Sequence, residues 1–353
     1  MEFQKFLSER KFEDLDAKAN ALQAEYETGR ISSAELLHGF RAFYSVSAKT
    51  TPLVDEWVRL FPRSYAARLA RGIHYRYLAG EARGGKWISE TSPEQVRTME
   101  HYLDVAMGEL RASEALTKKP ILTYLHELTV GMFMGDADSN RTALAKALAI
   151  DPKDFTVRRK YMYTITPRWL GSFEEMEEFL TASQKQGVSG QDLDSLKAMI
   201  EIERGRVSED NKKPEEAVIH YKRAIDLQPE RDQLIVALTY RLRVMQKLHP
   251  DVDDVVDADR LLRLSSNEAF ALEVRGHARY VAKDFSGALA DFGVAAGLGD
   301  AYAQLMLGRL YWNGQGVTQN RVEAEDWFRR SASNGNELAA KYLREIEKQG
   351  AAK

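Results

Sequence analysis

Residues 213–229 read KPEEAVIHYKRAIDLQP, and this stretch decides the fold. Ala217, Tyr221 and Ala224 recur at helical spacing, and a proline ends the run. Twelve residues before Ala217, Gly205 supplies the small residue that a preceding, crossing helix needs. The pattern predicts two helices that approach closely through small residues, with the aromatic ring filling the gap to the next pair.

The same frame returns further along the chain. Gly276 stands twelve residues before Ala288, which Phe292 and Ala295 follow. The intervening stretch 231–264 is degenerate, and we interpret it as a helix pair of weak consensus. Each pair leaves an apolar face that only a neighbouring pair can cover, so the pairs are predicted to stack in chain order. In this spacing the chain resembles tetratricopeptide (TPR) repeats.

A second kind of repeat follows. Residues 301–343 contain AQLMLGRLYWNGQGVTQNRVEAEDWFRRSASNGNELAAKYL and closely resemble a Sel1-like repeat. The matching positions are Leu307, Gly308, Leu310, Tyr311, Gly314, Gly316, Val317, Ala324, Trp327, Ala332, Gly335 and Ala339. Ser331 stands where alanine is usual, a conservative departure. Only one full Sel1-like unit is evident, and the resemblance implies that it ends a TPR-like array.

The N-terminal region, residues 1–185, resembles a bacterial helical domain of unknown function that occurs together with TPR or Sel1-like repeats. The segments that carry this resemblance are 55–58 (DEWV), 61–64 (FPRS), 82–84 (ARG) and 166–172 (TPRWLGS). The resemblance implies a bacterial source and no particular reaction.

The predicted fold class is therefore all-α, a right-handed α-solenoid of TPR-like and Sel1-like helix hairpins. The segment 187–190 (GVSG) is the predicted hinge. We expect an N-terminal helical domain over 1–187, TPR-like repeats over 188–299, and a Sel1-like repeat with a C-terminal cap over 300–350.

Composition excludes several classes of function. With 50 Lys and Arg against 53 Asp and Glu, the formal net charge of -3 provides no basic field for nucleic acid or an anionic membrane. The chain has no cysteine, which excludes disulfides, thiolate metal sites and a cysteine nucleophile. Residues 1–10 lack the apolar core of a secretory signal, and no apolar run reaches the length of a membrane span, so a cytoplasmic location is expected.

Three fragments are similar to metal-binding motifs, and each has a simpler explanation. Residues 253–257 (DDVVD) match a magnesium-diphosphate motif, but an acidic first turn also suits a helix dipole. Residues 136–140 begin like a calcium loop, yet Arg141 replaces the required glycine. His126 begins an HExxH motif whose second histidine is replaced by Val130. We therefore predict no catalytic residue, metal or cofactor, and a protein that is not an enzyme.

The numbering of positions within each repeat also predicts which residues form a partner-binding surface. In a TPR-like solenoid the first helices line the concave face, at positions two, five, nine and twelve when the small glycine is position eight. In the three units these positions are Met199, Ile202, Arg206 and Glu209; Phe270, Glu273, His277 and Tyr280; and Tyr302, Leu305, Arg309 and Trp312. The predicted partner-binding residues among them are Arg206, Glu273, His277, Tyr280, Arg309 and Trp312.

Cations at position nine beside aromatics at position twelve suit an extended peptide with acidic and apolar side chains. The alternative is that these residues pack against the next repeat or only solvate the groove. Phe270 and Leu305 are the two that we expect in the core.

A second candidate site lies in the N-terminal region. Arg83, Arg168 and Trp169 combine cations with an aromatic ring in turns, which suits an anion or a flat ligand. The alternative is a tryptophan that anchors a turn between helices. An enzyme would use a pocket near His74, Arg83 and Arg168.

The leading functional hypothesis is a scaffold that binds another protein or peptide. The alternatives are an immunity or regulatory partner of a bacterial toxin, an enzyme or ligand-binding protein, and a structural module that assembles with itself.

Overall fold

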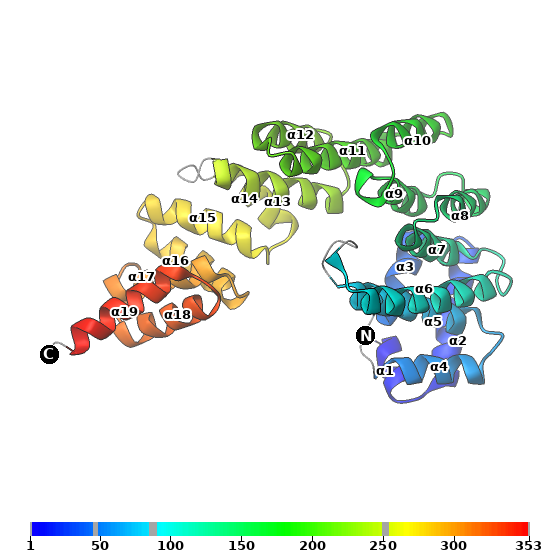
Figure 1. The fold of residues 1–353 in the computed structure, drawn as a ribbon, viewed down its shortest axis with the longest axis horizontal. Coiled ribbons are helices and arrows are strands. Elements are labelled where there is room, and N and C mark those ends of the chain that lie inside the picture. The colour runs from blue at the N-terminus through cyan, green and yellow to red at the C-terminus, as the bar shows by residue number, and fades with distance from the viewer. Residues whose placement is uncertain (1, 45–48, 85–89, 249–253, 352–353) are drawn as a thin grey trace. The chain divides into compact units, whose positions relative to one another are not determined.

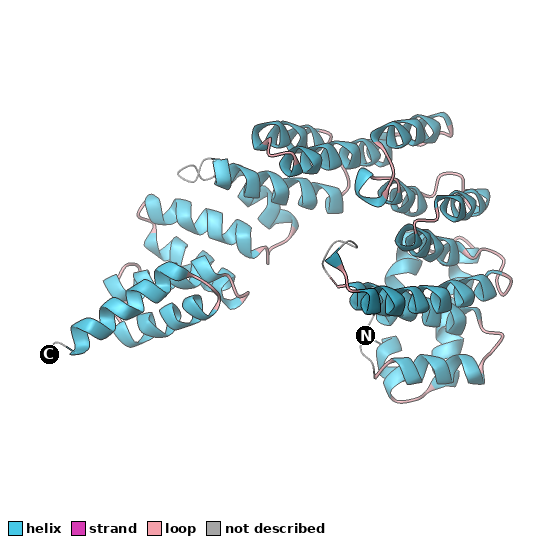
Figure 2. Cartoon of the chain, in the orientation of Figure 1, coloured by secondary structure: helices cyan, strands magenta, loops and turns pink. Residues whose placement is uncertain are grey.

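The computed structural model describes residues 2–44, 49–84, 90–248 and 254–351. In these ranges the chain forms helices joined by short connections, and none of it is β-strand (Figure 2). The chain divides into two compact units, Met1–Ser189 and Gly190–Lys353, and the boundary between them along the chain falls inside the segment 187–190. The prediction of an all-α protein is thus confirmed, while the further division at residue 299 stays a prediction.

Ten α-helices and two short 3-10 turns make up the described part of the first unit (Figure 1). They are α1 (Glu2–Ser8), α2 (Phe12–Glu27), α3 (Ser33–Phe40), η1 (Arg41–Phe43), α4 (Thr51–Leu60), α5 (Tyr65–Arg83), α6 (Pro93–Glu114), α7 (Ile121–Met134), α8 (Ala137–Ile150), α9 (Phe155–Thr164), η3 (Pro167–Trp169) and α10 (Phe173–Lys185). Helix α6 shows why helices begin where they do. Ser92, the N-cap, and Gln95, the third helical residue, form a reciprocal capping box, and Pro93 between them suits the first helical position.

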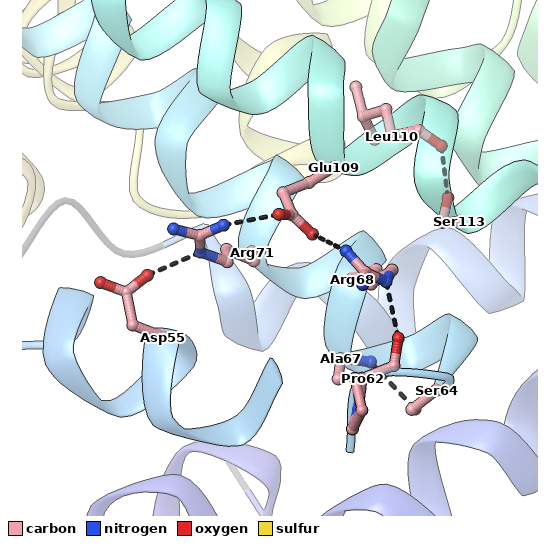
Figure 3. A network of polar contacts seen from close by, with 9 residues as sticks. All are labelled: Asp55, Pro62, Ser64, Ala67, Arg68, Arg71, Glu109, Leu110 and Ser113. Atoms are coloured by element: carbon pink, nitrogen blue, oxygen red, sulfur yellow. Dashed lines mark hydrogen bonds and ion pairs between the residues drawn. The ribbon is translucent and has the colours of Figure 1, made fainter. Parts of the chain in front are cut away.

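An ion-pair network joins three helices of this unit (Figure 3). Glu109 of α6 accepts hydrogen bonds from Arg68 Nη1 at 2.9 Å and Arg71 Nη1 at 2.5 Å, both on α5. Arg71 Nε also donates to Asp55 Oδ1 of α4 at 2.6 Å. These charges are partly buried and well paired, so the network fixes how α4, α5 and α6 lie against one another.

The second unit is a series of hairpins. Its helices are α11 (Gly190–Asp210), α12 (Pro214–Asp226), α13 (Arg231–Leu248), α14 (Val255–Leu264), α15 (Ala269–Val281), α16 (Phe285–Gly297), α17 (Ala301–Asn313), α18 (Arg321–Ser333) and α19 (Glu337–Ala351). Each helix packs against the next one along the chain (Figure 1). The degenerate stretch 231–264 supplies the pair α13 and α14. The predicted solenoid of stacked hairpins is therefore confirmed for this unit.

A glycine facing an aromatic ring sets the approach of the two helices in three of the hairpins. A Cβ atom added to Gly205 would lie 2.5 Å from the ring of Tyr221, and one added to Gly308 would lie 2.4 Å from the ring of Phe328. The corresponding contact from Gly276 to Phe292 would be 2.9 Å. Real Cβ atoms do not approach rings this closely, so the ring occupies the space that only glycine leaves.

The same rings reach the next hairpin. Tyr221 stacks on Tyr240 of α13 with ring centroids 5.5 Å apart, and Phe328 stacks on Tyr342 of α19 at 5.2 Å. Tyr221 and Phe328 therefore touch both their own hairpin and the following one. Such stacked pairs add to the burial energy, which explains why the hairpins stack instead of standing alone.

We expect Gly276→Ala and Gly308→Ala each to lower the free energy of unfolding by about 1–3 kcal/mol, because the added methyl group overpacks the ring contact. Urea denaturation followed by circular dichroism measures the change. The matched control is Gly293→Ala on α16, where an added Cβ meets nothing within 4 Å. That control should be neutral or stabilising by about 0.5–1 kcal/mol, because alanine has the higher helix propensity.

Equal destabilisation by all three substitutions would contradict the packing argument. Adding Phe328→Leu to Gly308→Ala makes room for the methyl group and should recover part of the loss.

Candidate functional site

The predicted partner face lies on the first helices of the hairpins in the second unit. Arg206 is on α11, His277 and Tyr280 are on α15, and Arg309 and Trp312 are on α17. All five side chains are half-buried, so each presents part of its surface to solvent.

Cations on this face stack on aromatic rings. The Arg206 guanidinium lies 5.2 Å from the ring centroid of Tyr240, and that of Arg309 lies 5.5 Å from the ring of Tyr280. Arg309 Nη2 also donates to Tyr280 Oη at 3.4 Å. Both contacts join neighbouring first helices, so position-nine arginines bridge successive repeats.

The Sel1-like unit continues the pattern with a residue from its second helix. Arg321, at the start of α18, lies 4.9 Å from the ring centroid of Trp312. Trp312 also packs on Phe328 at 6.5 Å, and His277 meets the ring of Tyr302 edge-on at 6.0 Å. The face therefore alternates positive charge with flat apolar surface.

Position five is a correction to the sequence prediction. Glu273, predicted to bind a partner, is 8% exposed, and its carboxylate accepts a hydrogen bond from Gln246 Nε2 of α13 at 3.1 Å. Ile202 and Leu305 at the same position are 8% and 2% exposed. Position five is buried in all three units, and Glu273 is hydrogen-bonded to the preceding hairpin instead of lining the open face. The expectation that Leu305 is core is confirmed.

Tyr240 is a face residue that the sequence interpretation missed, because the stretch 231–264 was treated as degenerate. The spacing of the repeats along the sequence identifies this residue. Tyr240 follows Arg206 by one TPR repeat length of about 34 residues, which places both at position nine.

In the first unit, the structure brings together three residues that were singled out as candidate ligand contacts. Arg83, Arg168 and Trp169 line one pocket of about 300 Å³. The other lining residues are Met99, Met132, Phe133, Met134, Gly135 and Leu170. Arg83 is the last residue of α5, and Arg168 and Trp169 form η3, so the pocket joins segments far apart in the sequence.

Two backbone features hold this pocket in place. Gly135 adopts a left-handed conformation, with φ 69°, ends α7 and is one of the residues that line the pocket. Behind η3, a Cβ added to Gly171 would lie 2.1 Å from the carbonyl oxygen of Ile165. The turn closes this tightly only because residue 171 is glycine, and that closure aims Trp169 toward Phe133, with ring centroids 5.5 Å apart and nearly perpendicular.

His74 does not belong to this pocket, so the predicted grouping with Arg83 and Arg168 is wrong. Its ring is fully buried on α5, with Nε2 2.8 Å from Thr51 Oγ1. Among the described residues that line the pocket, Arg83 and Arg168 carry positive charge, and Phe133 and Trp169 add aromatic surface.

The three metal-like fragments have structural roles where the structure describes them. Residue 253 lies outside the described residues, while Asp254 and Asp257 both pair with Arg241 Nη1, and Asp254 caps α14. Asp136 caps α8 by accepting a hydrogen bond from the Ser139 amide at 2.9 Å. His126 is buried, and burial lowers its pKa well below the usual range. Within the described ranges, no three His, Cys, Asp or Glu side chains gather as a metal site would require.

Comparison with known proteins agrees with this geometry. The model of the Sel1 repeat matches residues 203–229 and 301–336, and that of a domain of unknown function, DUF4034, matches residues 134–203. The first Sel1 match covers a unit that the sequence analysis had interpreted as TPR-like, so more than one Sel1 segment is present. No curated protein matches the chain.

Several solved structures are similar to the chain. A Sel1 repeat protein from Oxalobacter formigenes is 21% identical, with 94% of this chain and 91% of that one covered and a TM-score of 0.44. The protein c5321, a protective antigen present in uropathogenic Escherichia coli strains, displays an SLR fold; it is 15% identical over 94% and 83% of the two chains, with a TM-score of 0.39. The apo form of the quorum sensor NprR from B. thuringiensis is 13% identical over 95% and 97%, with a TM-score of 0.37.

The fold and its repeats define the chain as an all-α helical-repeat protein. Within that class, residues 203–229 and 301–336 match the Sel1 repeat and residues 134–203 match DUF4034. Repeats of this kind typically mediate protein–protein interaction, and Sel1-repeat proteins are generally non-enzymatic scaffolds. No helix in the described ranges combines the length and the apolar character that crossing a membrane requires.

A buried carboxyl group in the first unit gives a stability signature. Glu127 on α7 is 7% exposed, and burial, followed by repulsion from Glu114, raises its pKa to about 7. The folded chain therefore keeps this proton up to about pH 7, whereas the unfolded chain releases it near the ordinary value of 4.5. The contribution of Glu127 to the free energy of unfolding is therefore fully present below pH 4.5. It is lost as the pH rises through about 7.

We expect Glu127→Gln to raise the free energy of unfolding at pH 8 by about 1–3 kcal/mol, because the amide removes the cost of a buried charge. At pH 4.5 the variant and the wild type should differ little; urea denaturation across this pH range measures both. The matched contrast is Glu109→Gln, which deprives Arg68 and Arg71 of their carboxylate and should lower stability at pH 8. Parallel pH profiles for Glu127→Gln and wild type would contradict the assignment.

Proposed function

We propose that this protein is a scaffold that binds an extended segment of a partner protein across the first helices α11, α13, α15 and α17. The observation that carries the proposal is the set of arginines stacked on aromatic rings: the half-buried Arg206 on Tyr240 and Arg309 on Tyr280, and the exposed Arg321 on Trp312. Arginine and aromatic residues dominate the binding energy of protein interfaces.

Stacking also prepares these side chains for binding. A guanidinium that lies over a ring has already lost part of its rotamer freedom, so less entropy remains to be lost when a partner arrives. Stacking occupies the flat face of the guanidinium, whereas its N–H groups lie along the edge. A carboxylate of a partner can accept hydrogen bonds there. The face therefore suits a segment that alternates acidic with apolar or aromatic side chains.

The rival explanation is that these stacks only fasten one repeat to the next. Glu273 shows what such a residue looks like, since it is buried and bonded across the repeat boundary. Arg206, Arg309 and Trp312 differ because they keep exposed surface. An immunity or regulatory partner of a toxin would use the same face, and that refinement stays a prediction, as does a cytoplasmic location.

We expect the double substitution Arg309→Glu with Trp312→Ala to weaken binding of a partner captured by the wild-type chain at least about tenfold, because both residues are anchors of the kind that dominate interfaces. Calorimetric titration of the purified partner measures the affinity. The matched control is Lys222→Glu, a charge reversal on the second helix α12, where the side chain is 62% exposed.

Because Trp312 packs on Phe328, the double variant needs a thermal melt to show that it is folded. The single substitution Arg309→Glu removes only the stacked cation and should account for a large share of the loss. Unchanged affinity in both folded variants, or an equal loss with Lys222→Glu, would remove this face as the binding site.

A further inference from the structure

Two cations of the first unit, Arg76 and Lys160, belong neither to the partner face nor to the pocket beside η3. Arg76 is on α5 and Lys160 is on α9, and α7 packs against both of these helices. Both side chains are half-buried. Cationic side chains are seldom buried unless they are paired, so the partners of these two decide what they do.

Aromatic rings hold the guanidinium of Arg76 in place. It lies 4.1 Å from the ring centroid of Tyr77 and 5.9 Å from that of Tyr44. These two rings stack on each other with centroids 4.7 Å apart, and Tyr44 also meets the buried ring of His126 edge-on at 5.9 Å. Because the rings contact the flat face of the guanidinium, the terminal N–H groups along its edge can still donate hydrogen bonds.

Lys160 lies close enough to Arg76 for the two charges to repel each other. Burial, followed by repulsion from Arg76 and Arg159, lowers the pKa of Lys160 to about 8. Burial, followed by the charges of Arg76 and Lys160, lowers the pKa of His126 well below its usual range. At pH 7 Lys160 therefore keeps its proton while His126 is neutral, so the two like charges stay together in one region of the unit.

The described part of the chain provides no carboxylate partner for either cation. Neither Arg76 nor Lys160 forms an ion pair or a side-chain hydrogen bond with another described residue. The other residues of this unit, 1, 45–48 (SVSA) and 85–89 (GKWIS), include no Asp or Glu. The first unit therefore supplies no carboxylate that pairs with these two charges, and an anion from solution would balance them.

The number of charges selects the kind of anion. A carboxylate carries one negative charge and would leave one of the two cations unbalanced. A phosphoryl group carries about -1.5 to -2 charges at pH 7 and has three terminal oxygens, so donors from two helices can reach different oxygens. We propose that Arg76 and Lys160 together bind the phosphoryl group of a small molecule, Arg76 through its stacked guanidinium and Lys160 through its ammonium group.

Isothermal titration calorimetry of the full-length chain at pH 7 tests the proposal with three probes. They are inorganic phosphate, phenyl phosphate and acetate, compared at one ionic strength because salt screens charges. At least one of the phosphates should bind with one-to-one stoichiometry, and acetate should bind at least about tenfold more weakly because it balances only one cation. Tighter binding of phenyl phosphate would assign the site to a phosphate ester, whereas equal or tighter binding of inorganic phosphate would assign it to the free ion.

Substitutions then assign the binding to these two cations. Arg76→Gln and Lys160→Met should each weaken the better phosphate at least about tenfold, because each removes one charged donor. Lys160→Arg keeps the charge and should retain most of the affinity. The matched control is Arg63→Gln, which changes an exposed arginine of the same unit and should leave the affinity unchanged.

Thermal unfolding separates a binding cation from one that only holds the fold. Methionine is close to lysine in length, and Lys160→Met removes a half-buried charge that has no carboxylate partner. Without phosphate, the unfolding midpoint of this variant should therefore equal or exceed that of the wild type. Saturating phosphate should raise the midpoint of the wild type by about 3 °C or more and leave that of Lys160→Met unchanged.

Several results would overturn the phosphate site. They are the lack of a saturable heat with either phosphate, equal affinity for acetate, and a loss with Arg63→Gln as large as that with Arg76→Gln. Wild-type affinity in Lys160→Met, or a lower midpoint of that variant together with unchanged binding, would show that Lys160 only holds the fold. None of these results bears on the partner face, which lies on helices of the second unit.

Discussion

The contact between a glycine on one helix and an aromatic ring on the next is the constraint on which the repeat unit depends. Gly205, Gly276 and Gly308 leave the space that Tyr221, Phe292 and Phe328 fill. A larger residue would push the helices of a hairpin apart. The ring would then also lose its contact with the following hairpin. The contact between glycine and ring therefore sets the spacing of the two helices within a hairpin and the spacing between successive hairpins.

The chemistry of the partner face is a consequence of that spacing. Successive first helices lie close enough for Arg309 to reach Tyr280 and for Arg206 to reach Tyr240. The same closeness buries position five, where Glu273 takes part in a hydrogen bond between repeats. Neighbouring positions on one helix thus have different roles, and the difference depends on which of them the adjacent hairpin covers.

The pocket of the first unit does not depend on a repeat spacing. Its pocket is bordered by the ends of α5 and α7 and by the turn η3, and glycines at 135 and 171 allow the chain to close tightly there. Arginines, methionines and aromatic rings that belong to no repeat pattern meet at this point. A solenoid face built from regular spacing and a pocket built from irregular turns therefore occur in one chain, with different side chains.

The sequence by itself determined the all-helical class, the hairpin frame and the positions nine and twelve of three repeat units, because helical periodicity and small-to-large spacing are local properties of the chain. It also singled out Arg83, Arg168 and Trp169 as candidate ligand contacts, and it grouped the two arginines near one pocket together with His74. Only the tertiary structure decided that Glu273 is buried, that Arg206 lies over the ring of Tyr240 and that His74 lies outside the pocket. Burial depends on which surface a neighbouring element covers, and that information is distributed over segments far apart in the chain.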